Sequence, residues 1–203
     1  MQWKIKQRER NYDGHFKVDQ LTIEHELFSG ATSKPLIREQ VSRHNAVAVL
    51  PFDPERDEVV LVEQFRVGAL NKDDLQQVDT PWLIEVIAGL VEEGEELENV
   101  ACREALEEAD CKIENIMHVA SFFPSPGGFS EQAHVYLAKT NTAELGGIYG
   151  LEEEGEDIRV HVVPSEQAIE MLHKGKICSA ISMVAMYNFM RLREKLKQDW
   201  SGG

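Results

Sequence analysis

Alternation of apolar and polar residues predicts strands along much of the chain. Residues 16–28 alternate as a half-buried strand does, within a strand-rich opening that extends from residue 2 to residue 39. Apolar runs at 45–52 and 58–66 are separated by a turn that contains proline, which predicts a buried hairpin. Further strands are expected at 82–89, 116–123, 132–139 and 158–163.

Helical patterns are fewer and fall in the second half of the chain. Glu, Ala and Leu dominate residues 97–109, which predicts a helix there. Ser165 is expected to cap a second helix, and a last helix is expected to begin at Ser179 or Ser182. Strands therefore dominate, with a helix after the third core strand and others near the end, and this is the α+β class.

The charge balance bears on the kind of partner. The 203 residues include 36 acidic and 21 basic side chains, and the formal net charge is −15. Nucleic-acid binders present Lys and Arg to phosphate, so we expect no nucleic-acid partner. An acidic protein that binds an anionic substrate needs a positive bridge, and a divalent cation is the obvious candidate.

Cysteine usage and hydropathy give expectations about location. Three cysteines without close pair spacing argue against a disulfide framework and favour a reducing, cytoplasmic environment. Residues 1–8 lack an apolar signal core, and no apolar run approaches the roughly 18 residues of a membrane span. We therefore expect a cytoplasmic protein with no membrane segment.

The predicted helix at 97–109 concentrates negative charge on one face. Glu104, Glu107 and Glu108 stand at i, i+3 and i+4, so they share a face and repel by roughly a few tenths of a kcal/mol per pair. A bound Mg²⁺ would compensate, since hard oxygen ligands suit this ion. A solvated charged face is the alternative. It leaves the fixed spacing of glycines and charged residues around the helix unexplained.

Residues 89–111 resemble the Nudix box, a pattern of Gly, five residues, Glu, seven residues, Arg-Glu, apolar, any, Glu-Glu, any, Gly and apolar. The matching residues are Gly89, Glu95, Arg103, Glu104, Ala105, Glu107, Glu108 and Cys111. Asp110 departs from the pattern. A glycine there would end the helix in the left-handed region, which Asp tolerates better than most residues. The motif is long and specific.

This resemblance implies the Nudix fold, a mixed sheet between helices, and Mg²⁺-dependent cleavage of a diphosphate, with Mn²⁺ as an alternative ion. It implies that Glu104, Glu107 and Glu108 bind the metal together with the carbonyl of Ala88. Arg103 would orient a glutamate through a bidentate bond and, with Glu108, counts among the catalytic residues. The ion would neutralise charge on the diphosphate and activate a water.

Almost the whole chain is similar to the bacterial ADP-ribose pyrophosphatases, a branch of this family that forms AMP and ribose 5-phosphate. The similar segments are 51–54, 63–66, 80–85, 125–128 and 156–162. The branch carries its general base on an acidic loop, which here is 151–157. Position in that loop favours Glu154, with Glu152 and Glu153 as alternatives, and a solvated loop competes for each. A base on a loop could close onto the water when substrate is bound.

The same resemblance implies a set of substrate contacts. The matching positions are His15, Phe16, Arg38, Glu39, Arg66, Leu90, Ser125, Pro126, Gly127 and Glu131. Arginine is suited to phosphate, although any of these arginines could be an ordinary surface residue. Either His15 or Phe16 would stack on adenine, and a buried core phenylalanine is an equally good interpretation of Phe16. Arg43 is a further candidate that a surface role explains better.

In this branch the N-terminal strands swap between two subunits, which implies a homodimer. We therefore expect an N-terminal strand subdomain at 1–43, domain-swapped, and a Nudix hydrolase domain at 44–203. The role of the polar loop at 71–79 is left open.

The box leaves two other functions open. Its residues contact only the diphosphate and the metal, so another nucleoside diphosphate sugar such as GDP-mannose is a second candidate substrate. A non-catalytic Nudix sensor that binds ADP-ribose without cleaving it is a candidate of another class. The intact set of metal ligands argues against the sensor.

Overall fold

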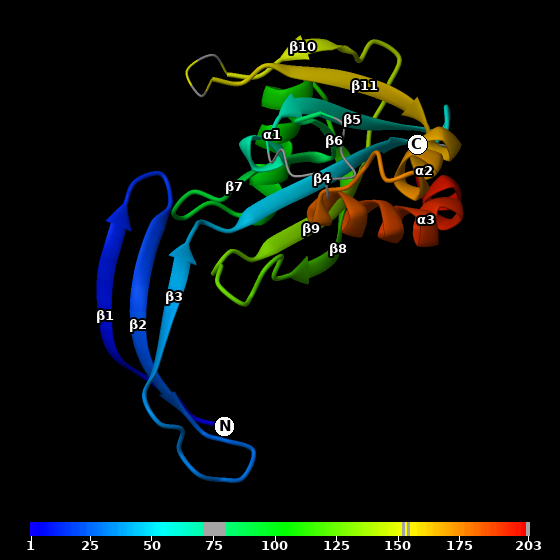
Figure 1. Cartoon of the computed structure of the whole chain (residues 1–203). Helices are drawn as coiled ribbons and strands as arrows, with labels where there is room; N and C mark the ends of the chain where they lie inside the picture. Colours follow the sequence, from blue (N-terminus) through cyan, green and yellow to red (C-terminus); the bar gives the residue numbers. More distant parts are fainter. Residues whose placement is uncertain (71–79, 152, 154, 202–203) are drawn as a thin grey trace. The chain divides into compact units, whose positions relative to one another are not determined.

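The computed structural model describes residues 1–70, 80–151, 153 and 155–201 (Figure 1). The chain divides into two compact units. Unit 1 comprises Met1–Asn45 and Phe122–Gln132, and unit 2 comprises Ala46–Ser121 and Ala133–Gly203. The loop that ends with Gln132 thus groups with the N-terminal strands, although it is distant from them in the sequence.

The described residues form eleven strands, three α-helices and one short 3-10 helix. The strands are β1 Trp3–Asp13, β2 Lys17–His25, β3 Leu36–Ser42, β4 Ala46–Asp53, β5 Glu58–Phe65, β6 Trp82–Glu85, β7 Ile87–Leu90, β8 Glu114–Phe122, β9 Ala133–Lys139, β10 Gly147–Tyr149 and β11 Ile158–Pro164. The helices are η1 Val67–Ala69, α1 Leu97–Ala109, α2 Ser165–His173 and α3 Ala180–Trp200. This content confirms the α+β class.

Unit 1 is a three-stranded antiparallel sheet in the order β1-β2-β3. Asp19 on β2 is inaccessible to solvent, and Arg8 on β1 donates to it at 2.7 Å. Arg10, two residues along the same strand, also bonds to it and lowers the pKa of Asp19 against the effect of desolvation. These partners satisfy a carboxylate that would otherwise be costly to remove from water.

Unit 2 is built on a mixed sheet in the order β10-β11-β5-β4-β9-β8, with β6 paired to β5 and β7 to β4 (Figure 1). Strands β4 and β9 are parallel. Every residue of β4 is buried, because helices cover both faces. Val47 and Val49 pack with Ala101 of α1, whereas Phe52 points the other way and meets Phe189 of α3 at 4.9 Å between ring centroids. The predicted mixed sheet between helices is confirmed.

The prediction of one continuous strand at 82–89 is wrong. The structure divides this segment at Val86 into β6 and β7, which pair with different strands. In the described residues, β4 and β5 pair with each other only at Phe52–Val59 and Asp53–Glu58, so beyond that point they diverge and the segment crosses between them. The apolar pattern around Val86 suits a continuous strand equally well, so the sequence carries no sign of the break.

Helix boundaries agree with the sequence at α1 and differ at α2. Ser165 was expected to cap α2, but it is the first helical residue, and Pro164 holds the capping position with φ −51°. Proline tolerates this place because its ring fixes φ and it has no N–H to satisfy. At α3, Ser179 holds the capping position and Ser182 lies inside the first turn. No helix in the described ranges has both the length and the apolar character needed to cross a membrane.

Asp110, which replaces the glycine of the box, ends α1 as predicted. Its φ is 48° and its ψ is 33°, in the left-handed region, and its N–H donates to the carbonyls of Ala105 and Leu106. The next residue, Cys111, donates its N–H to Ala105 and is buried. The helix therefore ends where a glycine would end it. Glu104, Glu107 and Glu108 stay within the helix.

Asp57 joins the β4–β5 turn to α3. Arg193 donates to its Oδ1 at 2.9 Å and Lys197 to its Oδ2 at 3.1 Å. The Arg193 guanidinium lowers the pKa of Asp57 to about 2, against the opposing effect of burial. Asp57 has φ 57°, a left-handed conformation that Asn also tolerates, so Asp57→Asn removes the charge without a new backbone strain.

We expect Asp57→Asn to lower the free energy of unfolding by about 1–2 kcal/mol at pH 7. Because the folded-state pKa is depressed, the carboxylate contributes its full stabilisation above its ordinary pKa, near 4, and loses it as the pH falls toward 2. Urea unfolding of both proteins between pH 7 and pH 2.5 measures this. A difference that stays constant across that range would contradict the ion-pair explanation.

Candidate functional site

The predicted metal-binding glutamates lie on α1 beside strand β7. Glu108 is 2% exposed and Glu104 is 9% exposed, while Glu107 is half-buried. One helical turn separates Glu104 from Glu108, so both lie on the face that packs against the sheet. The N–H of Ala88 donates to Glu108 Oε2 at 3.1 Å, and Gln64 Nε2 lies 3.5 Å from Oε1. The structure thus places Ala88 next to the buried glutamate.

Gly89 provides the space that Glu104 occupies. A Cβ built on Gly89 would lie 1.7 Å from Glu104 Oε1 and 1.8 Å from its Cδ. Gly89 is not among the residues with positive φ, so its backbone conformation would accept alanine. The box glycine is therefore required here for the close approach of α1 to β7.

Arg103 connects the charged residues of the box. Its Nε and Nη2 donate to the two carboxylate oxygens of Glu95 at 3.2 Å each, which is a bidentate pair. Its Nη1 donates to Glu104 Oε1 at 2.7 Å and to Glu107 Oε2 at 3.0 Å. Its Nη2 also reaches the carbonyl of Leu90 at 3.3 Å. The glutamate that Arg103 holds in bidentate fashion is therefore Glu95, whereas Glu104 and Glu107 share one nitrogen.

Burial and like charge raise the pKa values of two carboxyl groups. Desolvation raises the pKa of Glu108 to about 8 although the Ala88 N–H opposes the shift, and the charges of Glu104 and Glu156 add to it. Desolvation also raises the pKa of Glu104, against the effect of Arg103. Nearby hydrogen bonds do not fully offset the cost of removing these two carboxylates from water. A bound cation would stabilise their charged forms.

These carboxylates fit a hard divalent cation, which prefers oxygen donors. In the parts of the chain that the structure describes, no three His, Cys, Asp or Glu side chains form a ready-made cage. Arg103 donates to one carboxylate oxygen of Glu104 and to one of Glu107. An ion that keeps several waters and shares oxygens with substrate phosphates needs only one or two carboxylates from the protein. Glu104, Glu107 and Glu108 with the carbonyl of Ala88 could hold such an ion.

Arg66, a predicted substrate contact, is held by a buried carboxylate. Its Nε donates to Glu85 Oε2 at 2.6 Å, and its charge lowers the pKa of Glu108. Three further residues are associated with this site although the sequence did not predict them: Glu85, Gln64 and Glu156. Each lies in one of the segments that carry the family resemblance, and this was the available signal.

A second group of predicted residues gathers in unit 1. Arg43 Nη1 lies 3.0 Å from Glu131 Oε2, and its guanidinium carbon lies 5.7 Å from the centre of the Phe16 ring, within cation–π range. His15 meets Phe16 edge-on at 4.9 Å. Arg43, for which the sequence favours a surface role, is thus in contact with two predicted substrate residues.

Other predicted substrate residues of unit 1 lie on β3 and on the loop before β9. Arg38 donates to the carbonyl of Ile37 at 2.8 Å, and its neighbour Glu39 projects from the opposite face of the sheet. The carbonyl of Ser125 accepts hydrogen bonds from Gly128 and Phe129, which closes a turn. The turn contains Pro126 and Gly127.

The predicted base, Glu154, lies outside the described residues, as does the alternative Glu152. Glu153 is described and is exposed. Glu156 follows them, and its carboxylate accepts a hydrogen bond from the N–H of Leu151 at 3.1 Å. The choice among the glutamates of this loop therefore stays a prediction.

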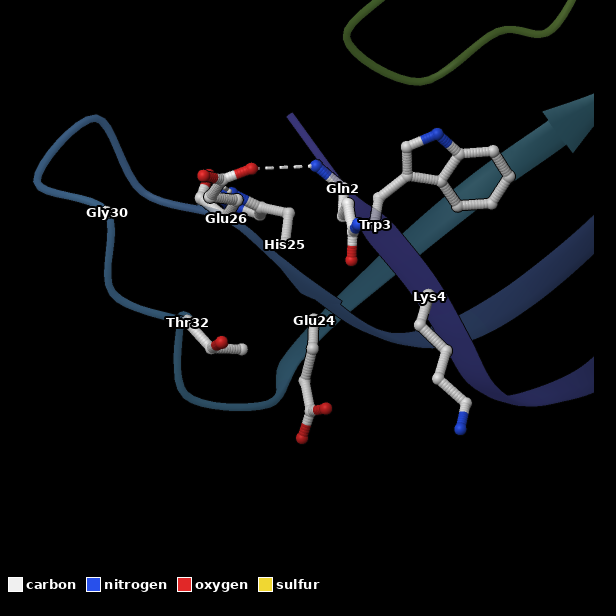
Figure 2. A pocket seen from close by; sticks show the side chains of 8 residues that line it. All are labelled: Gln2, Trp3, Lys4, Glu24, His25, Glu26, Gly30 and Thr32. Carbon is white, nitrogen blue, oxygen red and sulfur yellow. Dashed lines mark hydrogen bonds between the residues drawn. The ribbon is translucent and has the colours of Figure 1, made fainter.

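A hollow of about 430 Å³ lies at the end of unit 1 where β1 begins, and Figure 2 shows the residues around it. It is lined by Gln2, Trp3, Lys4, Glu24, His25, Glu26, Gly30 and Thr32. The N–H of Gln2 donates to Glu26 Oε2 at 3.0 Å, and Figure 2 draws this bond. Its lining contains none of the residues predicted to bind metal or substrate, so we do not assign the candidate site to it.

The sequence is similar to a known protein family and to several named enzymes. The family model described as NUDIX domain matches residues 42–180. The chain is 43% identical over 194 residues to the ADP-ribose pyrophosphatase of Escherichia coli (strain K12), covering 96% of this chain and 90% of that one. It is 40% identical over 189 residues to the ADP-ribose pyrophosphatase of Haemophilus influenzae, covering 93% and 86%. It is 32% identical over 159 residues to the GDP-mannose pyrophosphatase of Escherichia coli O1:K1 / APEC, covering 76% and 78%.

This chain belongs to the NUDIX family. A solved structure described as "Crystal structure of ADP compounds hydrolase" superposes with a TM-score of 0.68 at 20% identity, covering 98% of this chain and 96% of that one, which confirms the fold. Hydrolases of this family generally use a divalent metal, in agreement with the carboxylate set on α1.

Proposed function

We propose that this protein hydrolyses the diphosphate of ADP-ribose to AMP and ribose 5-phosphate, using Mg²⁺. The observation that carries the proposal is a pair of buried carboxylates inside the matched domain: Glu104 lies against Gly89, and Glu108 accepts the N–H of Ala88. The relatives named for this activity are 43% and 40% identical over nearly the whole chain. The relative named for GDP-mannose is 32% identical over 159 residues, which favours ADP-ribose.

In this proposal the residues of α1 and β7 hold the metal. Glu104, Glu107, Glu108 and the carbonyl of Ala88 are the protein ligands, and Mn²⁺ is an alternative ion. When bound, the ion neutralises charge on the diphosphate oxygens and lowers the pKa of a water. Arg103 keeps Glu104 and Glu107 in place through the bonds described above.

Proton transfer and substrate binding fall to residues outside α1. Glu154 takes the proton of the attacking water, with Glu152 and Glu153 as alternatives. Arg66, held by Glu85, binds a phosphate oxygen, and Phe16 or His15 stacks on the adenine. The remaining proposed contacts are Arg38, Glu39, Leu90, Ser125, Pro126, Gly127 and Glu131.

The proposal includes a homodimer in which the strands of 1–43 are exchanged. Unit 1 leaves large apolar side chains in solvent: Trp3 is 75% exposed, Phe28 96% and Ile37 61%. Exposed apolar surface of this kind is a common mark of a protein interface. Light scattering should give about twice the 23.0 kDa of one chain. The mass of a single chain at micromolar concentration would contradict the dimer.

A panel of nucleoside diphosphate sugars tests the substrate. Rates with ADP-ribose, GDP-mannose and ADP-glucose at saturating Mg²⁺ give kcat/KM for each, and ADP-ribose should have the largest value. A larger kcat/KM for GDP-mannose would move the protein to the second candidate substrate. The metal chemistry on α1 would then stand unchanged.

A further inference from the structure

The crossover at Val86 lies between two residues, Glu85 and Ala88, that each hold a side chain of the site. One residue before it, Glu85 holds Arg66, and two residues after it, Ala88 donates its N–H to Glu108. Glu85 pairs with Val62 of β5, whereas Ala88 pairs with Ala48 of β4. The conformation of Val86 therefore sets the position of the Glu85–Arg66 pair relative to the Ala88–Glu108 pair.

The N–H of Val86 belongs to neither strand ladder. Val86 is 1% exposed, so its N–H needs a partner inside the protein. That partner is the side chain of Ser182, whose Oγ accepts the bond at 3.0 Å although 96 residues separate the two in the chain. Ser182 is also 1% exposed and lies in the first turn of α3.

Ser182 is itself held in place. The hydroxyl of Ser179, at the capping position of α3, donates to Ser182 Oγ at 2.8 Å. The oxygen of Ser182 therefore receives two donors, one from its own helix and one from the crossover. The bond from Val86 to Ser182 also shows that the start of α3 lies beside the crossover.

We propose that Ser182 is a positioning residue for the metal and diphosphate site: it fixes the crossover at Val86 and thereby the spacing between the Glu85–Arg66 pair and the Ala88–Glu108 pair. This inference rests on the function proposed above. Without the acceptor, Val86 has a buried unpaired N–H, and the crossover shifts to find water or another oxygen. A shift of the segment moves both pairs. Mutation of residues that hold metal ligands in place typically lowers metal affinity or activity by about 10–100-fold.

The test compares Ser182→Ala and Ser182→Cys with the parent protein. Cysteine fills the space of the serine with a slightly larger sulfur that is a poor acceptor, so it weakens the bond without leaving a cavity and serves where the alanine variant does not fold. Asp57→Asn is the control for loss of stability alone, because Asp57 also contacts α3 but lies outside the proposed site. Circular dichroism and thermal unfolding identify the temperature at which all the variants are folded.

We expect kcat to fall about tenfold in both Ser182 variants, with KM for ADP-ribose changed less than about twofold, and the dissociation constant for Mn²⁺ alone to rise severalfold. Asp57→Asn should leave all three values unchanged. Folded Ser182 variants with the kcat and Mn²⁺ affinity of the parent would overturn the proposal. If the parent cleaves no nucleoside diphosphate sugar, the proposed function fails, and the Mn²⁺ titration still decides the role of Ser182.

Discussion

Glu108→Gln is expected to reduce kcat by roughly 10³-fold or more. The carboxylate is 2% exposed, and it is the proposed metal ligand with the least access to water. Loss of its charge weakens metal binding. A bound metal supplies several kcal/mol of charge stabilisation to the transition state of such reactions. Each 1.36 kcal/mol that is lost lowers the rate about tenfold. Single-turnover rates at saturating Mg²⁺ measure the effect.

Glutamine in place of Glu108 can still accept the N–H of Ala88, so the variant should remain folded. Thermal unfolding without metal checks this, and the midpoint should stay within about 5 °C of the parent protein. The matched control is Glu98→Gln, which neutralises another glutamate of α1 near its start. Unchanged turnover in Glu108→Gln would remove Glu108 from the metal site.

Gly89→Ala is expected to be nearly as damaging to activity. The new methyl group would lie 1.7 Å from Glu104 Oε1, so the Glu104 side chain must leave its position and its bond to Arg103. We expect kcat to fall by roughly 10²-fold and the apparent Mg²⁺ requirement to rise, since displaced ligands and their supports cost this much in metal sites. Titration of activity with Mg²⁺ measures both changes.

Gly68→Ala is the control for this substitution. A Cβ on Gly68 meets nothing within 4 Å, and Gly68 is not among the residues with positive φ. The control should retain the kcat of the parent protein. If Gly89→Ala also retained it, the close approach of α1 to β7 would have no part in the reaction.

Local sequence was enough to predict the elements that depend on near neighbours. Helix α1 follows from its own composition and spans Leu97–Ala109 as expected. The end of the helix at Asp110 follows from the tolerance of Asp for the left-handed region. The spacing of Glu104 and Glu108 likewise required no knowledge of the rest of the fold, since helical periodicity alone puts them on one face.

The missed features depend on contacts between distant parts of the chain. The break at Val86 arises because β4 and β5 diverge, and its N–H is satisfied by Ser182, 96 residues away. The pairing of Arg43 with Glu131 joins residues that are 88 positions apart, so no window of sequence contains it. A single sequence shows which residue types are present but not which distant partners they meet.

Product analysis decides whether this protein hydrolyses ADP-ribose. Purified protein is incubated with ADP-ribose and Mg²⁺, with a parallel sample in EDTA, and the products are separated by ion-exchange chromatography. Equal amounts of AMP and ribose 5-phosphate with Mg²⁺, and neither in EDTA, are expected. ADP-ribose that binds in the presence of Mg²⁺ and is recovered uncleaved would contradict the proposed hydrolysis and favour a sensor.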